Sequence, residues 1–254
     1  MIYKKRADHR AEASYRVAAQ LLESAVPSRP VVLKPNIVEP SRPPVTTDVR
    51  VVEGIVRALR ESGIKDILVA EGSGTGNTLE NFDLLGYSDL GVKLLDLDQE
   101  ETVRLPVAHH HVWDEVIVPE VLLDKFIISV PVLKEHSLCG VTISLKNMIG
   151  ILPAPHYSGY WTYKKSQVHK YDTHGCIADI IQVVSPDWAI VDASQGMKDH
   201  HLSGSPIEPP LNLVYGSADP LEADRFGCEL LGREHADILY LKLIEEDRRE
   251  GSQQ

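Results

Sequence analysis

Cysteine is scarce in this 254-residue chain. It has three, Cys139, Cys176 and Cys228, which are far apart and form no C-x-x-C arrangement. Isolated cysteines argue against a disulfide framework. They also argue against an iron–sulfur cluster bound by this chain alone, because such a cluster needs about four ligands. The pattern is typical of a protein from a reducing, intracellular setting.

Long apolar runs and excess positive charge are also missing. No stretch approaches the roughly 18 apolar residues that cross a membrane, and the basic N-terminus is followed by no apolar run like that of a signal peptide. The formal net charge of −11 argues against a general nucleic-acid-binding protein, because such proteins present a basic face. We therefore expect a cytoplasmic protein with neither nucleic-acid nor membrane partners.

The sequence does contain short apolar runs that alternate with helical patterns. Runs typical of buried strands lie within 29–36, 64–72, 122–136, 187–194 and 211–217. Helical spacing of apolar residues lies between them. We expect Thr47 or Asp48 to cap one of these helices and Asp219 to cap another. Consecutive β-α-β units of this kind form parallel strands with right-handed crossovers.

The expected fold class is therefore α/β: a mainly parallel sheet flanked by helices. Short alternating segments over 92–120 predict an edge β excursion, and long loops are expected over the C-terminal strand ends. We interpret 1–254 as one α/β domain, or as two small lobes around one crevice, with a loose tail at 246–254. Residues 138–152 mix apolar and small residues, so the pattern leaves helix and strand open there.

Each predicted strand ends in polar residues, and this is the main evidence for a site. The residues are Lys34 with Asn36, Glu71, Lys134 with His136, Asp192, and Ser217 with Asp219. In open α/β sheets, ligands bind beyond the carboxyl ends of parallel strands. One lysine at a strand end is usually a solvated surface residue, but five strands that end alike predict a crevice. A structural ion-pair network around the loops is the alternative.

The residue types at these positions favour an anionic ligand. Lys34, Lys134 and Lys146 would neutralise a carboxylate or phosphate. Glu71, Asp192 and Asp219 would position other groups, move protons or hold a divalent metal. The groups expected to orient the ligand are Asn36, Thr46, Thr47 and Asn147.

Histidine is the expected proton carrier. His136 or His169 would transfer protons in the crevice, and the sequence does not decide between His169 and His174 as the functional histidine of the downstream loop. The run at 109–111 is better explained as a solvated loop than as a metal site, because no third ligand follows at a recognisable spacing. The segment "GSGTGN" at 72–77 matches no phosphate-binding fingerprint and is interpreted as a flexible turn.

Several motifs, in this order, resemble a known family. They include "VVLKPN", "VTTD", "VPVLKEH", "VTISLKNMIG", "AIVDASQGM" and "GSADPLEAD", between Val31 and Gly232. The chain resembles the family catalogued as domain of unknown function 362. Some members carry a ferredoxin-like cluster module, but this chain lacks such cysteines, so that redox assignment does not carry over. The chain also departs from the family at "GMKDHHLSGSP", where the family has a shorter glycine-rich stretch.

That family is distantly similar to the nickel-pincer lactate racemase family. Proteins of the latter act on 2-hydroxy acids with lysine and histidine residues in a cleft between α/β lobes. The resemblance implies a crevice rich in lysine and histidine. It leaves nickel and racemisation open for this chain.

The resulting hypothesis is an enzyme that acts on a small anionic molecule, with or without a metal or other cofactor. Its reaction would be racemase- or isomerase-like, or associated with an oxidoreductase. The alternative is a non-catalytic carrier for a metal-containing cofactor or an acidic metabolite. The expected partner is the small anionic ligand, and a homodimer is left open.

Overall fold

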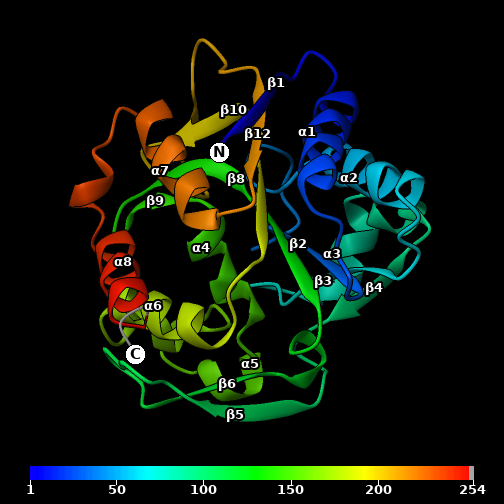
Figure 1. Cartoon of the computed structure of the whole chain (residues 1–254). Helices are drawn as coiled ribbons and strands as arrows, with labels where there is room; N and C mark the ends of the chain where they lie inside the picture. Colours follow the sequence, from blue (N-terminus) through cyan, green and yellow to red (C-terminus); the bar gives the residue numbers. More distant parts are fainter. Residues whose placement is uncertain (252–254) are drawn as a thin grey trace.

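The apolar runs of the sequence form the central strands of a mixed sheet in the computed structural model, which describes residues 1–251 (Figure 1). Five strands are parallel, in the spatial order β4 (Lys93–Asp96), β3 (Ile67–Glu71), β2 (Val31–Pro35), β7 (Phe126–Val130) and β10 (Trp188–Lys198). Beyond β10, the strand β12 (Leu213–Ser217) pairs antiparallel with β10, and the edge strand β1 (Tyr3–Arg6) pairs antiparallel with β12. The expected α/β class, with a mainly parallel sheet, is confirmed.

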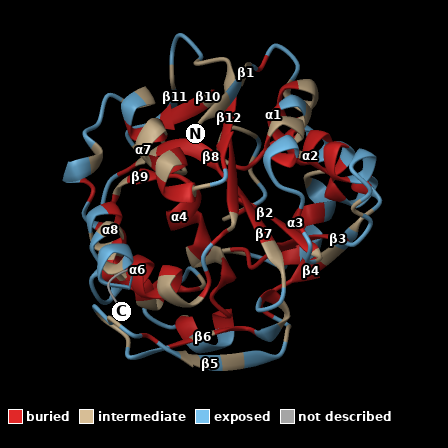
Figure 2. Cartoon of the chain, viewed as in Figure 1, coloured by how far each residue is buried: buried red, intermediate tan, exposed pale blue. Residues whose placement is uncertain are grey.

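Helices cover both faces of this sheet. One face packs against α1 (Arg10–Ser24), α2 (Val49–Glu61) and α3 (Thr78–Leu84), and the other against α4 (Ser144–Asn147), α6 (Thr173–Val183), α7 (Pro220–Leu230) and α8 (Leu239–Gly251). Neighbouring strand residues point to opposite faces. Val31 and Leu33 accordingly lie in one apolar cluster and Val32 in the other. Every residue of β2 and β3 is buried, and most of the sheet interior is red in Figure 2.

Three short strands extend the sheet near the carboxyl ends of the parallel strands. β8 (Val132–His136) runs parallel to β10, β9 (Gly140–Thr142) pairs antiparallel with β8, and β11 (Ser205–Pro206) pairs antiparallel with β10. Of the edge excursion expected over 92–120, the first segment is instead β4 of the main sheet. The other two segments form a separate antiparallel hairpin of β5 (Thr102–Pro106) and β6 (Glu115–Pro119), below the sheet in Figure 1. The remaining elements are η1 (Tyr87–Leu90), η2 (Glu120–Leu122), η3 (Met148–Ile151), α5 (Ala154–Tyr157), η4 (Ser166–His169) and η5 (His235–Asp237).

Two of the predicted helix caps are present. The side chain of Asp48 accepts a hydrogen bond from the backbone N–H of Arg50 (3.0 Å) and caps α2. Asp219 likewise accepts from the N–H of Leu221 (3.0 Å) at the start of α7. Each carboxylate satisfies a donor that has no partner within its helix.

The C-terminal segment differs from expectation. Residues 246–251 are helical rather than a loose tail, because α8 continues to Gly251. The buried side chains of Leu241 and Ile244 hold this helix on the apolar core. The rest of the expected tail, 252–254, lies outside the described residues. No helix within 1–251 is both long enough and apolar enough to span a bilayer.

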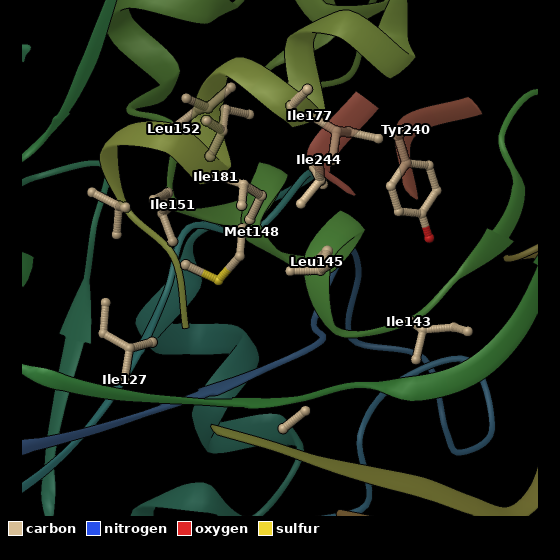
Figure 3. Close-up of a cluster of buried hydrophobic side chains, with 14 of the residues drawn as sticks. Ile127, Ile143, Leu145, Met148, Ile151, Leu152, Ile177, Ile181, Tyr240 and Ile244 are labelled. Atoms are coloured by element: carbon tan, nitrogen blue, oxygen red, sulfur yellow. The ribbon is translucent and has the colours of Figure 1, made fainter. Parts of the chain in front are cut away.

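Residues 138–152, which the pattern left open, contain both kinds of structure. β9 comes first, and then α4 and η3 follow without a break. Figure 3 shows Leu145 and Met148 of this segment packed among isoleucines of α6 and α8. These buried contacts fix the short helix α4 against the rest of the molecule.

Candidate functional site

A cavity of about 480 Å³ opens at the carboxyl ends of the parallel strands. Its walls come from the ends of β2 and β3, the β8–β9 hairpin, the α4–η3 segment, the loop and short helix over 161–169, and the turn between β10 and β11. The predicted site residues that line it are Lys34, Asn36, Glu71, Lys134, His136, Lys146, Asn147 and His169. Segments far apart in the sequence therefore meet in one cavity.

Two predicted ligand-orienting residues do not line the cavity. The hydroxyl of Thr47 donates to the carbonyl of Val130 (2.6 Å) and accepts from the N–H of Asn36 (2.8 Å). The hydroxyl of Thr46 donates to the carbonyl of Ser41 (2.6 Å). Both side chains are used to hold the loop after β2 in place.

Asp192 and Asp219 also lie outside the cavity wall. Asp192 points to the same sheet face as Ile190, toward α1, where Arg10 lies 3.9 Å from its carboxylate. Burial raises the pKa of Asp192. Asp219 follows β12, which runs antiparallel to β10. It therefore lies near the amino-terminal ends of the parallel strands, away from the cavity, and pairs with Arg248 (2.9 Å). The expectation that all five strand ends share one edge is wrong for β12.

Lys34 and Glu71 form a buried ion pair on the cavity floor. The Nζ of Lys34 lies 2.9 Å from both carboxylate oxygens and also donates to the carbonyl of Pro35 (3.0 Å). Glu71 accepts two more hydrogen bonds, from the N–H groups of Ile37 and Gly72 (3.0 and 2.9 Å). Burial lowers the pKa of Lys34, against the attraction of Glu71. Because its charge is already paired with the carboxylate of Glu71, Lys34 has no unpaired charge to offer a ligand.

Two asparagines connect this pair to Lys134. The amide oxygen of Asn147 accepts from Lys34 (3.3 Å) and from the amide of Asn36 (3.2 Å). The oxygen of Asn36 in turn accepts from Lys134 (2.6 Å). A continuous hydrogen-bonded chain thus runs across the floor from Glu71 to Lys134, and it fixes the direction of both amides.

Lys134 is fully buried and has no carboxylate partner within residues 1–251. Its Nζ donates to three neutral oxygens: those of Asn36, the carbonyl of Val45 (2.7 Å) and the carbonyl of His201 (3.4 Å). Burial, followed by repulsion from Lys146, lowers the pKa of Lys134 to about 7. An amine with such a pKa can both accept and release a proton near neutral pH.

Lys146 is the cavity lysine whose amine has no partner among the described residues. It projects from α4, is 8% exposed and lines the wall, yet its Nζ has no hydrogen bond or ion pair within residues 1–251. Burial lowers its pKa. An isolated buried ammonium is costly unless a partner neutralises it, so Lys146 is a preformed position for an anion.

Other buried polar atoms of the wall have no partner either. Within the described chain, the hydroxyl of Thr142 and the Nδ1 atoms of His169 and His201 make no hydrogen bond. Burial lowers the pKa of His169 to about 4 and of His201 to about 3, so both rings are neutral at pH 7. Unsatisfied buried polar groups are rare in folded proteins, and their concentration here indicates a place for a polar ligand.

His136 and His200 are held in one tautomer by the backbone. The Nδ1 of His136 accepts from the N–H groups of Leu138 and Cys139 (3.1 and 3.2 Å). The Nδ1 of His200 accepts from those of Leu202 and Ser203 (both 3.2 Å). A neutral ring with Nδ1 as acceptor carries its proton on Nε2. Burial strongly lowers the pKa of His136, which therefore stays a neutral Nε2–H donor.

Two lysines of the wall, Lys164 and Lys165, were not predicted. Lys165 donates to Asp98 (2.9 Å) and to the carbonyl of Gly72 (2.5 Å), and Lys164 reaches the other oxygen of Asp98 (3.2 Å). These contacts hold the loop before η4 over the cavity. The signals that could have found them are the Asp98 that follows β4 and the paired lysines within an aperiodic loop.

His174 and His111 have structural contacts outside the cavity. His174 lies on α6, where its Nδ1 accepts the N–H of Tyr240 (3.2 Å). His111 pairs with Asp247 (3.1 Å) and does not line the cavity. Among residues 1–251, no three His, Cys, Asp or Glu side chains form a group that could hold a metal ion. Of the two histidines that the sequence left open, His169 is the one in the cavity.

Comparison with known proteins gives a family and no activity. No curated protein matches the chain. A crystal structure of a protein from Thermotoga maritima is similar over 87% of this chain, with 16% sequence identity and a TM-score of 0.47. This chain covers 58% of that protein. The family model described as "Domain of unknown function (DUF362)" matches residues 31–229, and the chain therefore belongs to the DUF362 family.

Proposed function

We propose that the protein is an enzyme that binds a small organic anion in this cavity and moves a proton to or from it. The observation that carries the proposal is the unpaired buried ammonium of Lys146. Of the side chains on the cavity wall, five are lysines and one, Glu71, is a carboxylate. Glu71 is paired with Lys34, and Lys164 and Lys165 are paired with Asp98. Lys134 and Lys146 are left without a carboxylate among the described residues, so the wall favours an anion although the whole chain has a formal charge of −11.

The residues divide into roles by the partners they already have. Lys146 would anchor the anion, and the Nε2–H of His136 and the hydroxyl of Thr142 would add neutral donors. Lys134 lines the cavity and would carry the proton, because the pKa of this buried amine lies near neutral pH. Its contact with the carbonyl of His201 (3.4 Å) is the longest of its three hydrogen bonds, so this N–H is the one that would turn to the ligand. The Lys34–Glu71 pair and the two asparagines would hold Lys134 in place without touching the ligand.

Solvent exchange tests the proton transfer. The protein would be incubated with a panel of small carboxylic and phosphorylated acids in D₂O, and deuterium uptake into each acid would be followed by mass spectrometry. We expect exchange into at least one acid with the wild type and none with Lys134→Gln, whose amide can still donate to Asn36 but cannot carry a proton.

Binding of the same acids separates this proposal from the carrier alternative. If calorimetry detects an acid that binds and no acid exchanges or reacts, the protein is a carrier and the enzymatic proposal fails. If no acid binds at all, the anion site itself is wrong.

A further inference from the structure

The cavity is larger and more apolar than an inorganic anion requires. Its volume of about 480 Å³ lies within the range of roughly 300–1,000 Å³ that is typical of pockets for whole organic ligands. A phosphate or acetate ion held at Lys146 would leave most of this space empty. The other residues of the wall therefore indicate which kind of chemical group the rest of the ligand has.

The cavity wall contains apolar as well as polar side chains. Apart from the lysines, histidines and amides already described, the lining includes a set of apolar side chains: Ile37, Val38, Leu138, Ile149, Val168 and Leu202. Leu138 is 58% exposed, although leucine is usually buried. When an apolar ligand group covers an exposed leucine beside a cavity, apolar surface is removed from water, which favours binding.

Aromatic rings add to the same wall. Trp161 and Tyr163 line the cavity and are 50% and 43% exposed. The ring of Trp161 stacks on that of His169, with centroids 4.9 Å apart and planes at 18°. Trp161 thus covers one side of an imidazole whose Nδ1 is buried without a partner. An aromatic ring that is half exposed at a cavity wall offers apolar surface to a bound ligand.

We propose that the natural ligand is an amphiphilic organic acid, with a carboxylate or phosphate group at Lys146 and an apolar body against Leu138, Trp161 and Tyr163. This inference rests on the proposed anion site and adds the class of molecule that the site takes. It excludes inorganic anions and small, fully polar acids as the preferred ligands. The shared chemistry is an anionic head with an apolar body, whichever acid supplies the head.

Matched pairs of probes test this inference in the 254-residue chain. Calorimetry would compare inorganic phosphate with phenyl phosphate, and acetate with benzoate. We expect each aromatic acid to bind at least about tenfold more tightly than its small partner, because burying a ring removes apolar surface from water. Benzamide, which keeps the ring and lacks the charge, should bind at least about tenfold more weakly than benzoate. The stronger of the two aromatic acids identifies the preferred head group.

A variant of the exposed wall makes the test specific. Leu138→Ala should lower the ratio of the phenyl phosphate affinity to the phosphate affinity by about three- to tenfold. Leu84→Ala on α3, where Leu84 is 73% exposed and outside the cavity wall, should leave that ratio as in the wild type. If small and aromatic acids bind equally well, the amphiphilic ligand is ruled out while the anion site stands. If neither kind binds, the proposed function itself has failed.

Discussion

Two buried lysines at the same cavity are in opposite states. Lys34 donates to Glu71, to a backbone carbonyl and to Asn147, and its ammonium is fully partnered. Lys146 is nearly as buried and has no partner among the described residues. The difference separates framework from binding site: the first lysine maintains the cavity floor, and the second stands ready for a ligand. Residue type and burial do not distinguish these two lysines, but their partners do.

The largest effect should come from removing the framework lysine. Lys34→Met would leave the Glu71 carboxylate buried and unpaired, so the free energy of unfolding should fall by about 3–5 kcal/mol. Urea denaturation measures this, with Lys65→Met at an exposed position as the matched control. The double variant Lys34→Met with Glu71→Leu should recover most of the loss, since it removes both charges. If the single variant is as stable as the control, Lys34 is no framework residue.

Replacing Lys146 should weaken ligand binding without lowering the stability of the protein. Lys146→Met removes the proposed charged donor, so the affinity for phenyl phosphate should fall by about ten- to a hundredfold. The free energy of unfolding should stay unchanged or rise, because an unpaired buried charge is lost. Calorimetry and urea denaturation on the same sample measure both. A variant that unfolds as readily as Lys34→Met would show that the two lysines do not differ.

A smaller effect is expected at Gly150, which packs directly on the framework pair. A Cβ at this position would overlap both the carboxylate of Glu71 and the Nζ of Lys34. Gly150→Ala should therefore lower the free energy of unfolding by about 1–3 kcal/mol through overpacking. Gly251→Ala is the control, since a Cβ there meets no atom within 4 Å. Equal stability of the two variants would mean that the floor can rearrange.

Proton uptake is the smallest expected signal. An anion beside Lys134 and Lys146 raises their pKa values, which burial has lowered. At pH 8, binding of phenyl phosphate should therefore take up close to one proton, about the amount by which an amine of pKa 7 is deprotonated there. Calorimetry in buffers with different ionisation enthalpies measures the uptake. No uptake would mean that both lysines are already charged in the free protein.

The sequence predicted the parts of the site that depend on local geometry. Lys34 and Glu71 follow neighbouring parallel strands, so their meeting at one edge could be inferred from the order of strands and helices. Asp219 also follows a strand, but β12 is antiparallel, and no local signal gives the direction of a strand. Asp192 was misplaced because strand alternation directs its side chain toward α1, on the other face.

The partner state of each lysine could not be predicted at all. Whether an ammonium is paired depends on contacts between distant segments, such as Asn36 with Asn147, more than one hundred residues apart along the chain. The lysines that hold the loop over the cavity, Lys164 and Lys165, lie in a segment without periodicity. Their link to Asp98 is visible only once the chain is folded.

The central claim is that the amines of Lys134 and Lys146 have no carboxylate partner within residues 1–251, and that a bound anion supplies the negative charge. Carbon-13 NMR of the lysine Cε atoms, assigned with Lys134→Gln and Lys146→Met, measures their titration directly. We expect the resonance of Lys134 to titrate near pH 7 in the free protein and well above that when phenyl phosphate is bound. Titration of both lysines near the ordinary value of about 10.4, unchanged by the anion, would contradict the account.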